Sequence, residues 1–426
     1  MPMNPTTRPA NYRQRVIDAE LAEALSAAGA VLLEGPRGCG KTATATIAAR
    51  SQVRLDVDEA MRQAGLVAPQ LLLTGDRPRL IDEWQLVPAV WDHVRRAVDD
   101  KPDEAGHFIL TGSAVPEEVT ERHTGGMRIL RLRMRPMSLA ESGHSTQSVS
   151  LAGLMAGETP AAMDPGLDIH ALAQRIAVGG WPGLISRTPD QVRRILVSYL
   201  EDTRRIDLVR VDGVRRDPEN VGRVLRSLAR HIANQTSARA IAADVSGSDQ
   251  AIKEETVADY IRALTRVFIE EDLPAWSPAL RSRVPHRRVV KRHFVDPSLA
   301  VAALGATPAR LVRDVETMGF LLESMVVRDL RVHAQAIGAR VFYYGDDSGL
   351  EADAIVEDAT GRWGAFEVKL GQSQVDEAAA HLLEVARRVD PEKHGGPAVL
   401  AVVTGWGPAY RRSDGVCVVP IGALGP

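Results

Sequence analysis

The stretch GAVLLEGPRGCGKT, residues 29–42, decides the fold of the N-terminal part of this chain. Its apolar first half predicts a buried strand, and its second half fits the pattern G-x-x-x-x-G-K-[ST] between a strand and a helix. Small residues let backbone N–H groups surround phosphates, and the helix N-terminus adds positive potential. The alternative is a tight turn that matches by chance, which the strand and helix context disfavours. We therefore expect ATP to bind here.

Within this loop, Lys41 would reach the β- and γ-phosphates, and the Thr42 hydroxyl would ligate Mg²⁺. Cys39 is either simply a small residue that fits or a thiol whose alkylation would disturb ATP binding. The expected nucleotide-binding residues are the eight of the motif: Gly35, Pro36, Arg37, Gly38, Cys39, Gly40, Lys41 and Thr42.

The segment RLIDE, residues 79–83, supplies the acids that such a loop requires. An apolar strand that ends in two acids would present Asp82 to the magnesium shell and Glu83 to the attacking water as its activating base. Two solvated acids at a strand end are the alternative. The strand VRLDVD, residues 53–58, lies between the two motifs, so we expect a strand to intervene between them in the sheet.

The N-terminal strands alternate with segments that are compatible with helices, such as residues 88–100. This alternation predicts a parallel α/β sheet covered on both faces. The apolar–Arg alternation of residues 127–136 predicts an outer strand with one solvated face.

Size and composition limit the remaining possibilities. A chain of 426 residues with 45% hydrophobic and 25% charged residues predicts a globular protein of about two or three domains. A net charge of −3 confines any nucleic-acid role to a local patch. Cys39 and Cys417 match no zinc spacing and favour a reducing compartment. Neither a signal peptide nor a run of ~20 apolar residues is apparent, so we expect a cytoplasmic protein with no membrane contact.

Composition shifts along the chain suggest five regions. Residues 143–168 are rich in Gly, Ser, Thr, Pro and Asp without periodicity, which is typical of a linker. The expected regions are an N-terminal helical segment (1–28), the phosphate-binding domain (29–142), the linker (143–168), a helical and winged-helix domain (169–305) and a C-terminal α/β domain (306–426).

The winged helix is predicted from the order helix, turn, helix, strand over residues 238–276, followed by a second strand over 281–296. The wing, residues 281–292, holds six Lys or Arg residues and no acid. Such a stripe can neutralise DNA phosphates without reading bases. A solvated hairpin is an equally good interpretation.

The stretch LEADAIVEDATGRWGAFEVKLG, residues 350–371, carries a second candidate site. Glu367 and Lys369 share one strand face, and Asp353 can face the same side if the two strands pair as a hairpin. Asp353 and Glu367 would then bind one Mg²⁺, with Lys369 beside the attacking water or the leaving oxygen. A cross-strand ion pair would also explain the polar face.

Lysine is rare in this chain, with six residues among 52 basic ones: 41, 101, 253, 291, 369 and 393. Where positive charge suffices, the chain uses Arg, so a retained Lys hints at a role for a compact ammonium group. Lys41 and Lys369 lie within the two motifs.

Landmarks spread over nearly the whole chain carry a family resemblance. They are YRQR (12–15), GPRGCGKT (35–42), LIDEWQLVP (80–88), FILTGS (108–113), RPMSLAE (135–141), GGWP (179–182), KRHFVDPSLA (291–300) and FLLESMVVRDLR (320–331). The chain resembles prokaryotic AAA-type ATPases with a C-terminal domain of unknown function and a nuclease-like fold. The resemblance implies an AAA-type parallel sheet, a helical and winged-helix domain, and a restriction-endonuclease-like α/β domain.

The resemblance also implies roles for further residues. Ser113 would sense the γ-phosphate, with Thr111 as the alternative, although an ordinary strand end fits equally well. Arg128 would contact the γ-phosphate in cis or from a neighbouring subunit of a homo-oligomer; the Gly that usually precedes it is Met127 here. Glu323, on the first helix of the nuclease-like domain, would add a further acid to the C-terminal site.

Two functions remain open at the level of sequence. The first is Mg²⁺-dependent ATP hydrolysis that controls a C-terminal domain acting on DNA. The second is an ATP-dependent signalling switch whose C-terminal domain is a catalytically inactive docking module for a partner or nucleic acid.

Overall fold

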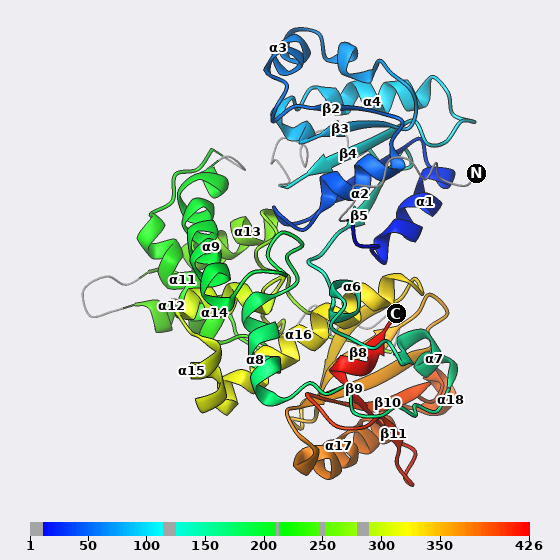
Figure 1. Ribbon diagram of the computed structural model, residues 1–426, viewed down its shortest axis with the longest axis vertical. Helices are drawn as coiled ribbons and strands as arrows, with labels where there is room; N and C mark the ends of the chain where they lie inside the picture. The colour runs from blue at the N-terminus through cyan, green and yellow to red at the C-terminus, as the bar shows by residue number, and fades with distance from the viewer. Residues whose placement is uncertain (1–11, 114–124, 210–212, 247–251, 279–288) are drawn as a thin grey trace. The chain divides into compact units, whose positions relative to one another are not determined.

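The computed structural model describes residues 12–113, 125–209, 213–246, 252–278 and 289–426. The chain divides into two compact units (Figure 1), one built mainly from residues up to Pro136 and the other mainly from Met137 onward. Each unit is described by itself.

The described strands of the first unit form a five-stranded parallel sheet in the order β2-β3-β4-β1-β5. Their bounds are β1 Ala30–Glu34, β2 Ser51–Arg54, β3 Arg79–Asp82, β4 Phe108–Gly112 and β5 Ile129–Arg133. The central strands β3 and β4 are buried along their whole length, as expected where helices cover both faces of a parallel sheet. The edge strand β5 has the solvated positions that its Arg alternation predicts.

A strand does separate the phosphate-binding strand β1 from the acid-bearing strand β3, and it is β4; β2, from the segment between the two motifs, lies at the edge. The register pairs Glu34 with Gly112 and Thr111 with Asp82. Parallel strands end at one edge of a sheet, so the loop after β1 and the acids after β3 come together there.

Helices cover both faces of this sheet, with bounds α1 Ile17–Ala27, α2 Lys41–Ala48, α3 Glu59–Val67 and α4 Val90–Asp99. One apolar cluster joins α4 to the sheet through Trp91 and Val94, beside Trp84. The other joins α1 and α2 to the sheet through Leu21 and Ala45. The two-sided burial matches the predicted α/β layering.

The second unit begins with helices and ends in a sheet. Its helices are α6 Leu139–Ser142, α7 Leu151–Ala156, α8 Ile169–Val178, α9 Pro189–Asp202, α11 Pro218–Arg230, α12 Ala238–Val245, α13 Glu254–Arg266, α14 Pro297–Leu304, α15 Pro308–Arg313, α16 Val315–Gln335, α17 Val375–Arg388 and α18 Pro391–His394. Side-chain oxygens accept from backbone N–H groups at many of their N-termini, as at Asp168, Thr188 and Asp217. No helix in the described part of the chain is both long and apolar enough to cross a bilayer.

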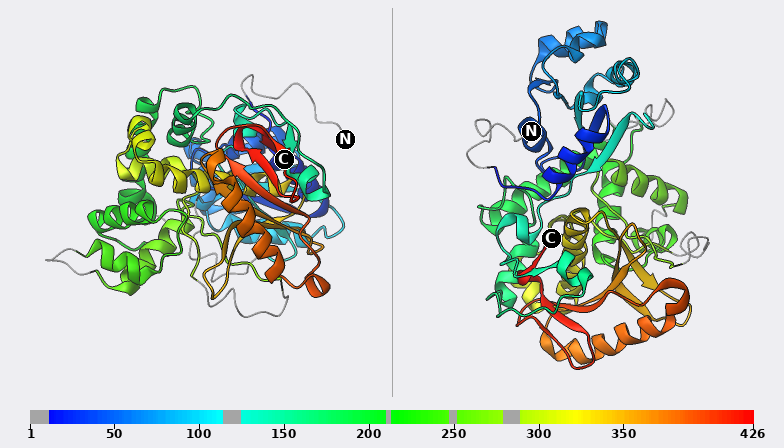
Figure 2. Two further views of the ribbon diagram at one scale, coloured as in Figure 1. Left: turned by 90° about the horizontal axis from the view of Figure 1, so that it is seen from below. Right: turned by 90° about the vertical axis from the view of Figure 1, so that its right-hand side faces the viewer.

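The described strands of the C-terminal region form a six-stranded mixed sheet in the order β11-β12-β10-β9-β8-β7. Their bounds are β7 Arg340–Gly345, β8 Glu351–Glu357, β9 Trp363–Lys369, β10 Val399–Thr404, β11 Tyr410–Arg411 and β12 Cys417–Pro420. The predicted hairpin is present, because β8 and β9 pair antiparallel with Ala354 opposite Phe366. Helix α17 packs along one face of this sheet (Figure 2).

Helix α16 is buried around most of its circumference, which is unusual for a helix of 21 residues. It packs on α8, α14 and α15 of the helical region and also on β7, β8 and β9. Residues 306–426 fall in the same compact unit as the helical region, and α16 contacts elements of both.

The segment 143–168 is not a simple linker. It contains α7 and the short strand β6 (Val149–Ser150), which pairs in parallel with β13 (Leu424–Gly425). Ser145 Oγ also donates to the carbonyl oxygen of Leu424, at 2.7 Å. Polar composition reflects local caps and turns here rather than a loose chain.

Helices α12 and α13 follow the predicted helix-turn-helix order. Among the described residues, the segments expected to be strands after them pair with each other through isolated antiparallel bridges of Glu270 with Phe294 and Leu273 with Lys291. The basic wing was predicted at 281–292, and its residues 281–288 lie outside the described residues.

Candidate functional sites

The phosphate-binding loop has a backbone that requires glycine at two positions. Gly40 caps α2 with φ 107°, in the left-handed region. Gly35 has φ 159°, and a Cβ there would lie 2.0 Å from the carbonyl oxygen of Met134. The loop conformation is therefore built into the sequence.

Lys41 turns its ammonium group back into this loop. Nζ donates to the carbonyl oxygens of Gly35 and Pro36, at 2.9 Å each, and the side chain is buried. Both acceptors belong to the loop itself. In a nucleotide complex, phosphate oxygens would take over from these carbonyl oxygens as acceptors for the ammonium group.

Thr42 and Asp82 meet as predicted for a magnesium site. Thr42 Oγ1 donates to Asp82 Oδ1 and Oδ2, at 2.9 and 3.1 Å. Asp82 is buried, accepts from Thr111 Oγ1, and has Arg54 Nε 3.6 Å from Oδ2. A hydroxyl and a carboxylate are hard oxygen donors of the kind that Mg²⁺ takes beside nucleotide phosphates, so these two residues fit the ion.

Glu83 follows Asp82 in a left-handed conformation with φ 54°. For a non-glycine residue this conformation costs about 1–2 kcal/mol, and such strain persists where the surroundings enforce it. The Glu83 N–H donates to Thr111 Oγ1 at 3.3 Å, and Ser113 Oγ donates to Glu83 Oε2 at 3.1 Å. Thr111 thus contacts the Asp82 carboxylate and the Glu83 backbone, and Ser113 contacts the Glu83 carboxylate.

Arg128 lies at the wrong end of its strand for a contact in cis. Ala30 and Ile129 pair at the start of β1 and β5, whereas the loop follows Glu34 at the other end, roughly 15 Å along the strands. Arg128 Nε instead donates to Asp99 Oδ1 at 2.5 Å. The cis contact is therefore wrong, and Met127 holds φ 68°, in the left-handed region that favours glycine.

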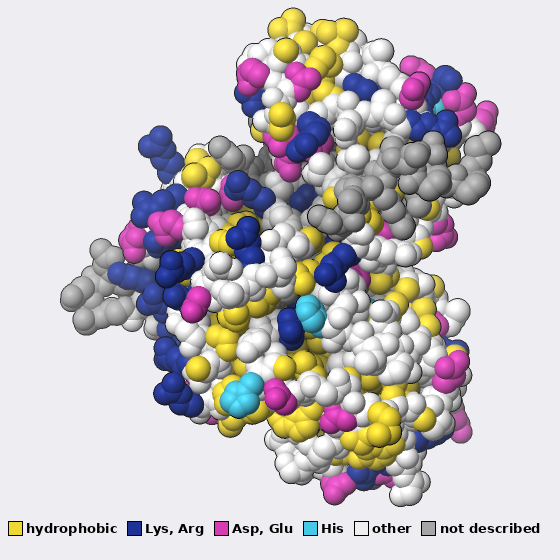
Figure 3. Space-filling view, viewed as in Figure 1, with side chains coloured by type: hydrophobic (Ala, Val, Ile, Leu, Met, Phe, Trp, Pro, Cys, Tyr) yellow, Lys and Arg dark blue, Asp and Glu magenta, His cyan; other side chains and the backbone are white. Residues whose placement is uncertain are grey.

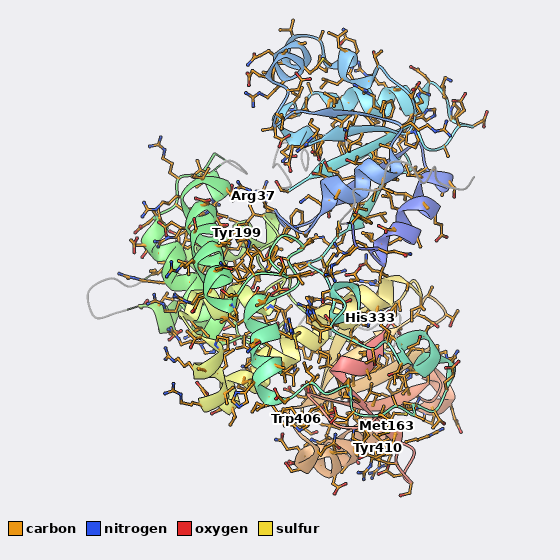
Figure 4. All side chains as sticks on the ribbon, viewed as in Figure 1. Arg37, Met163, Tyr199, His333, Trp406 and Tyr410 are labelled. Carbon is orange, nitrogen blue, oxygen red and sulfur yellow. The ribbon has the colours of Figure 1, made fainter. Side chains whose placement is uncertain are left out.

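Two side chains of the loop do not face a nucleotide. Cys39 is fully buried in the apolar cluster under α1 and α2, which favours the alternative that it is a small residue that fits. Arg37, labelled in Figure 4, is largely exposed, and its Nη1 lies 3.8 Å from Asp207 Oδ2.

The YRQR segment, used above only as a landmark, supports the loop from outside. Arg15 is buried and donates to the carbonyl oxygens of Cys39, at 2.8 Å, and of Arg135, at 2.7 Å. The Tyr12 hydroxyl donates to Asp18 and lies 2.7 Å from Thr44 Oγ1 on α2. Arg15 is thus a positioning residue that the motif search missed.

The predicted C-terminal acids and lysine converge. Lys369 Nζ donates to Glu367 Oε1 at 3.0 Å. Asp353 Oδ2 accepts from the N–H of Val368 at 2.8 Å, which fixes its carboxylate beside β9. Glu323 on α16 reaches the same cluster, as expected from the family resemblance.

Lys291 is the unexpected member of this cluster. Its Nζ lies 2.9 Å from Glu323 Oε1 and 3.1 Å from Asp353 Oδ1, and the residue is only 4% exposed. Its neighbour Arg292 pairs with Glu270 and Asp272. The prediction that these two wing residues face phosphates is therefore wrong. The rarity of lysine was the signal that could have singled out Lys291.

Burial and mutual repulsion govern the charges of this site. Burial, followed by the charge of Asp353, raises the pKa of Glu323 to about 8 and holds the pKa of Glu367 well above its usual range. Burial alone would lower the pKa of Lys291, but Glu323 and Asp353 raise it. In the described part of the chain, no three His, Cys, Asp or Glu side chains are arranged to hold a metal ion.

Four of the landmarks meet in a buried ionic knot rather than in a reactive site. Arg328 donates to Asp296 at 2.8 Å and to Asp329 at 2.6 Å, and all three are buried. Asp296 also accepts from the N–H of Gly180, and Asp329 from the N–H of Leu139. The knot joins the segments RPMSLAE, GGWP, KRHFVDPSLA and FLLESMVVRDLR.

Three family models match the chain. Residues 27–143 match an AAA domain, 169–310 a domain of unknown function (DUF8612), and 318–424 a domain of unknown function (DUF4143). With the loop, Lys41 and the acids after β3 in place, the N-terminal part is an AAA-type P-loop ATPase domain, followed by two domains of unknown function.

Particular relatives are distant and uncharacterised. The chain is 25% identical over 356 residues to uncharacterized protein Rv2008c of Mycobacterium tuberculosis and equally to Mb2031c of Mycobacterium bovis, covering 82% of this chain and 72% of each relative. A solved structure, the Walker-type ATPase PABY2304 of Pyrococcus abyssi, is similar at 15% identity and a TM-score of 0.45, over 71% of this chain and 99% of that one.

Proposed function

We propose that this protein hydrolyses ATP with bound Mg²⁺ and uses the cycle to control its C-terminal region. The observation that carries the proposal is the meeting of Lys41, Thr42, Asp82 and Glu83 at one edge of the sheet. Lys41 would hold the β- and γ-phosphates, Thr42 and Asp82 would hold Mg²⁺, and Glu83 would take a proton from the attacking water. Bound Mg²⁺ would neutralise charge on the phosphates.

Changing Lys41 tests this assignment. Lys41→Ala removes the ammonium group that meets the phosphates, so ATP turnover by the purified protein should fall on the order of 100-fold. Lys101→Ala is the matched control, because Lys101 is exposed and, in the described part of the chain, its ion pair is with Glu104. Equal turnover by wild type and Lys41→Ala would refute the ATPase assignment.

DNA is the partner we propose for the second unit, in a homo-oligomer where Arg128 would reach the nucleotide of a neighbouring subunit. Arg side chains gather over helices α9, α11 and α12 (Figure 3), where Arg223, Arg226 and Arg230 of α11 are exposed. Such a surface can neutralise backbone phosphates. The helix-turn-helix order of α12 and α13 supports a winged-helix domain.

For the C-terminal region, two functions each have an observation in their favour. The convergence of Asp353, Glu367 and Lys369 supports a restriction-endonuclease-like domain that cleaves DNA with a divalent metal. The contact of Lys291 with Glu323 and Asp353 supports a catalytically silent docking module.

Nicking of supercoiled plasmid, with Mg²⁺ or Mn²⁺ and with or without ATP, separates these functions. Cleavage that Asp353→Ala or Lys369→Ala reduces on the order of 100-fold or more would establish the nuclease. Lys101→Ala, which changes an exposed lysine outside both the site and the helix-turn-helix, is the control. No metal-dependent nicking of any DNA form would favour the docking module, and stimulation of ATP turnover by DNA would still identify DNA as a partner.

A further inference from the structure

Lys291 enters the C-terminal cluster from the helical region, outside the mixed sheet. Its backbone exchanges two hydrogen bonds with Leu273, at 3.1 and 2.9 Å. The next residue, Arg292, donates its N–H to the carbonyl oxygen of Asn234, at 3.0 Å. These bonds fix the backbone of residues 291 and 292, and therefore limit where the Lys291 ammonium group can lie.

The ammonium group lies where carboxylates from two separate elements meet. Glu323 comes from α16 and Asp353 from β8, and each has an oxygen within 3.1 Å of Lys291 Nζ. Glu351 Oε2 lies 3.9 Å from the same atom. The Lys291 ammonium group is a compact cation beside carboxylate oxygens. It offsets their negative charge, as a divalent ion does in a carboxylate metal site.

One oxygen of the cluster has no partner even so. Glu367 is 6% exposed, and its Oε1 accepts from Lys369, but Oε2 has no hydrogen-bond partner among the described residues. A buried carboxylate oxygen without a donor is costly and has the chemistry of a metal ligand. Glu367 Oε2 is therefore an oxygen donor that a metal ion could use once the charge of Lys291 is removed.

We infer that Lys291 is an internal cation that takes the place of a divalent metal ion in this site. While Lys291 is present, Glu323 and Asp353 are neutralised from within the chain and the site takes up no metal; without Lys291 the carboxylates form a divalent-cation site. The inference uses the C-terminal site of the proposed function but does not require that the site cleaves DNA. It makes metal uptake depend on how the helical region packs.

Binding of Mn²⁺ in the absence of nucleotide, followed by the electron paramagnetic resonance of the free ion, tests this inference. Lys291→Met keeps an unbranched side chain that is one atom shorter and removes its charge. We expect this variant to bind one more Mn²⁺ per chain than wild type. The affinity of this site for Mn²⁺ should be at least about tenfold higher than in wild type, because changes to groups around metal sites have effects of that size. Lys291→Met/Asp353→Asn should lose the additional ion, and the exposed-lysine control Lys253→Met should bind as wild type does.

Thermal unfolding provides a readout independent of stoichiometry. Lys291→Met leaves buried carboxylates without their cation, so its Tm should fall, and Mn²⁺ should raise that Tm while leaving the wild-type Tm unchanged. If the variant folds poorly, Lys291→Met/Glu323→Gln removes one charge of each sign and should show the same Mn²⁺ dependence.

Three outcomes would overturn the inference. Wild-type protein could bind Mn²⁺ that Asp353→Asn abolishes; folded Lys291→Met could bind no additional ion; or Mn²⁺ could fail to restore folding to both variants. Mn²⁺ uptake by Lys291→Met without any DNA nicking would support the inference while contradicting the nuclease, so the two proposals fail separately.

Discussion

Replacing Glu83 with glutamine is expected to lower ATP turnover by about 10²–10⁴-fold while ATP binding persists, because the amide cannot take a proton from water. Glu83 is placed for this role after the buried strand β3, with Oε2 accepting from Ser113 Oγ. Glutamine has the same shape and retains the backbone contact of Glu83 N–H with Thr111. Steady-state turnover and equilibrium binding of a fluorescent ATP analogue measure the two effects.

Glu83→Gly separates chemistry from strain. Glycine adopts the observed φ of 54° without the penalty of a side chain. The variant should therefore lose turnover, as Glu83→Gln does, yet gain up to about 1 kcal/mol in the free energy of unfolding, because relief of strain is partly offset by the entropy of glycine. Wild-type turnover by Glu83→Gln would assign the proton transfer to another residue.

The N-terminal domain could be predicted well because its signals are local. The loop, the strand before it and the acids of RLIDE are each short patterns with a mechanism, and the structure brings Thr42 and Asp82 within hydrogen-bond distance. Sheet order is not local: β4 lies between β1 and β3 although it follows both in sequence. The cis alternative for Arg128 was wrong for the same reason, since its distance from the loop depends on which end of β5 it occupies.

The C-terminal site was predicted in part. Strand periodicity and the hairpin located Asp353, Glu367 and Lys369, and the family resemblance added Glu323. Lys291 could not be placed, because a lysine in a basic run looks the same whether it faces water or inserts between carboxylates. Only the fold, which pairs Lys291 with Leu273, distinguishes these cases.

The knot around Arg328 has the largest expected effect on stability. Arg328→Met removes the guanidinium group that donates to Asp296 and Asp329. Among the described residues, the donors that remain for the two buried carboxylates are neutral: backbone N–H groups and the Ser298 hydroxyl. Breaking a buried ion pair on one side costs about 3–5 kcal/mol, far more than an exposed pair. We therefore expect a loss of that size in the free energy of unfolding, measured with urea.

Local and global readouts distinguish this knot from an ordinary buried arginine. The amides of Leu139 and Gly180 donate to the two aspartates, so peptides that contain them should lose hydrogen-exchange protection in Arg328→Met.

The exposed-arginine control Arg313→Met should change stability by less than about 0.5 kcal/mol. Arg328→Met/Asp296→Asn/Asp329→Asn should recover part of the loss, because it removes the buried charges together. If Arg328→Met costs under about 1 kcal/mol and leaves both amides protected, the four landmark segments are held together by apolar packing, and the charges at their junction are incidental.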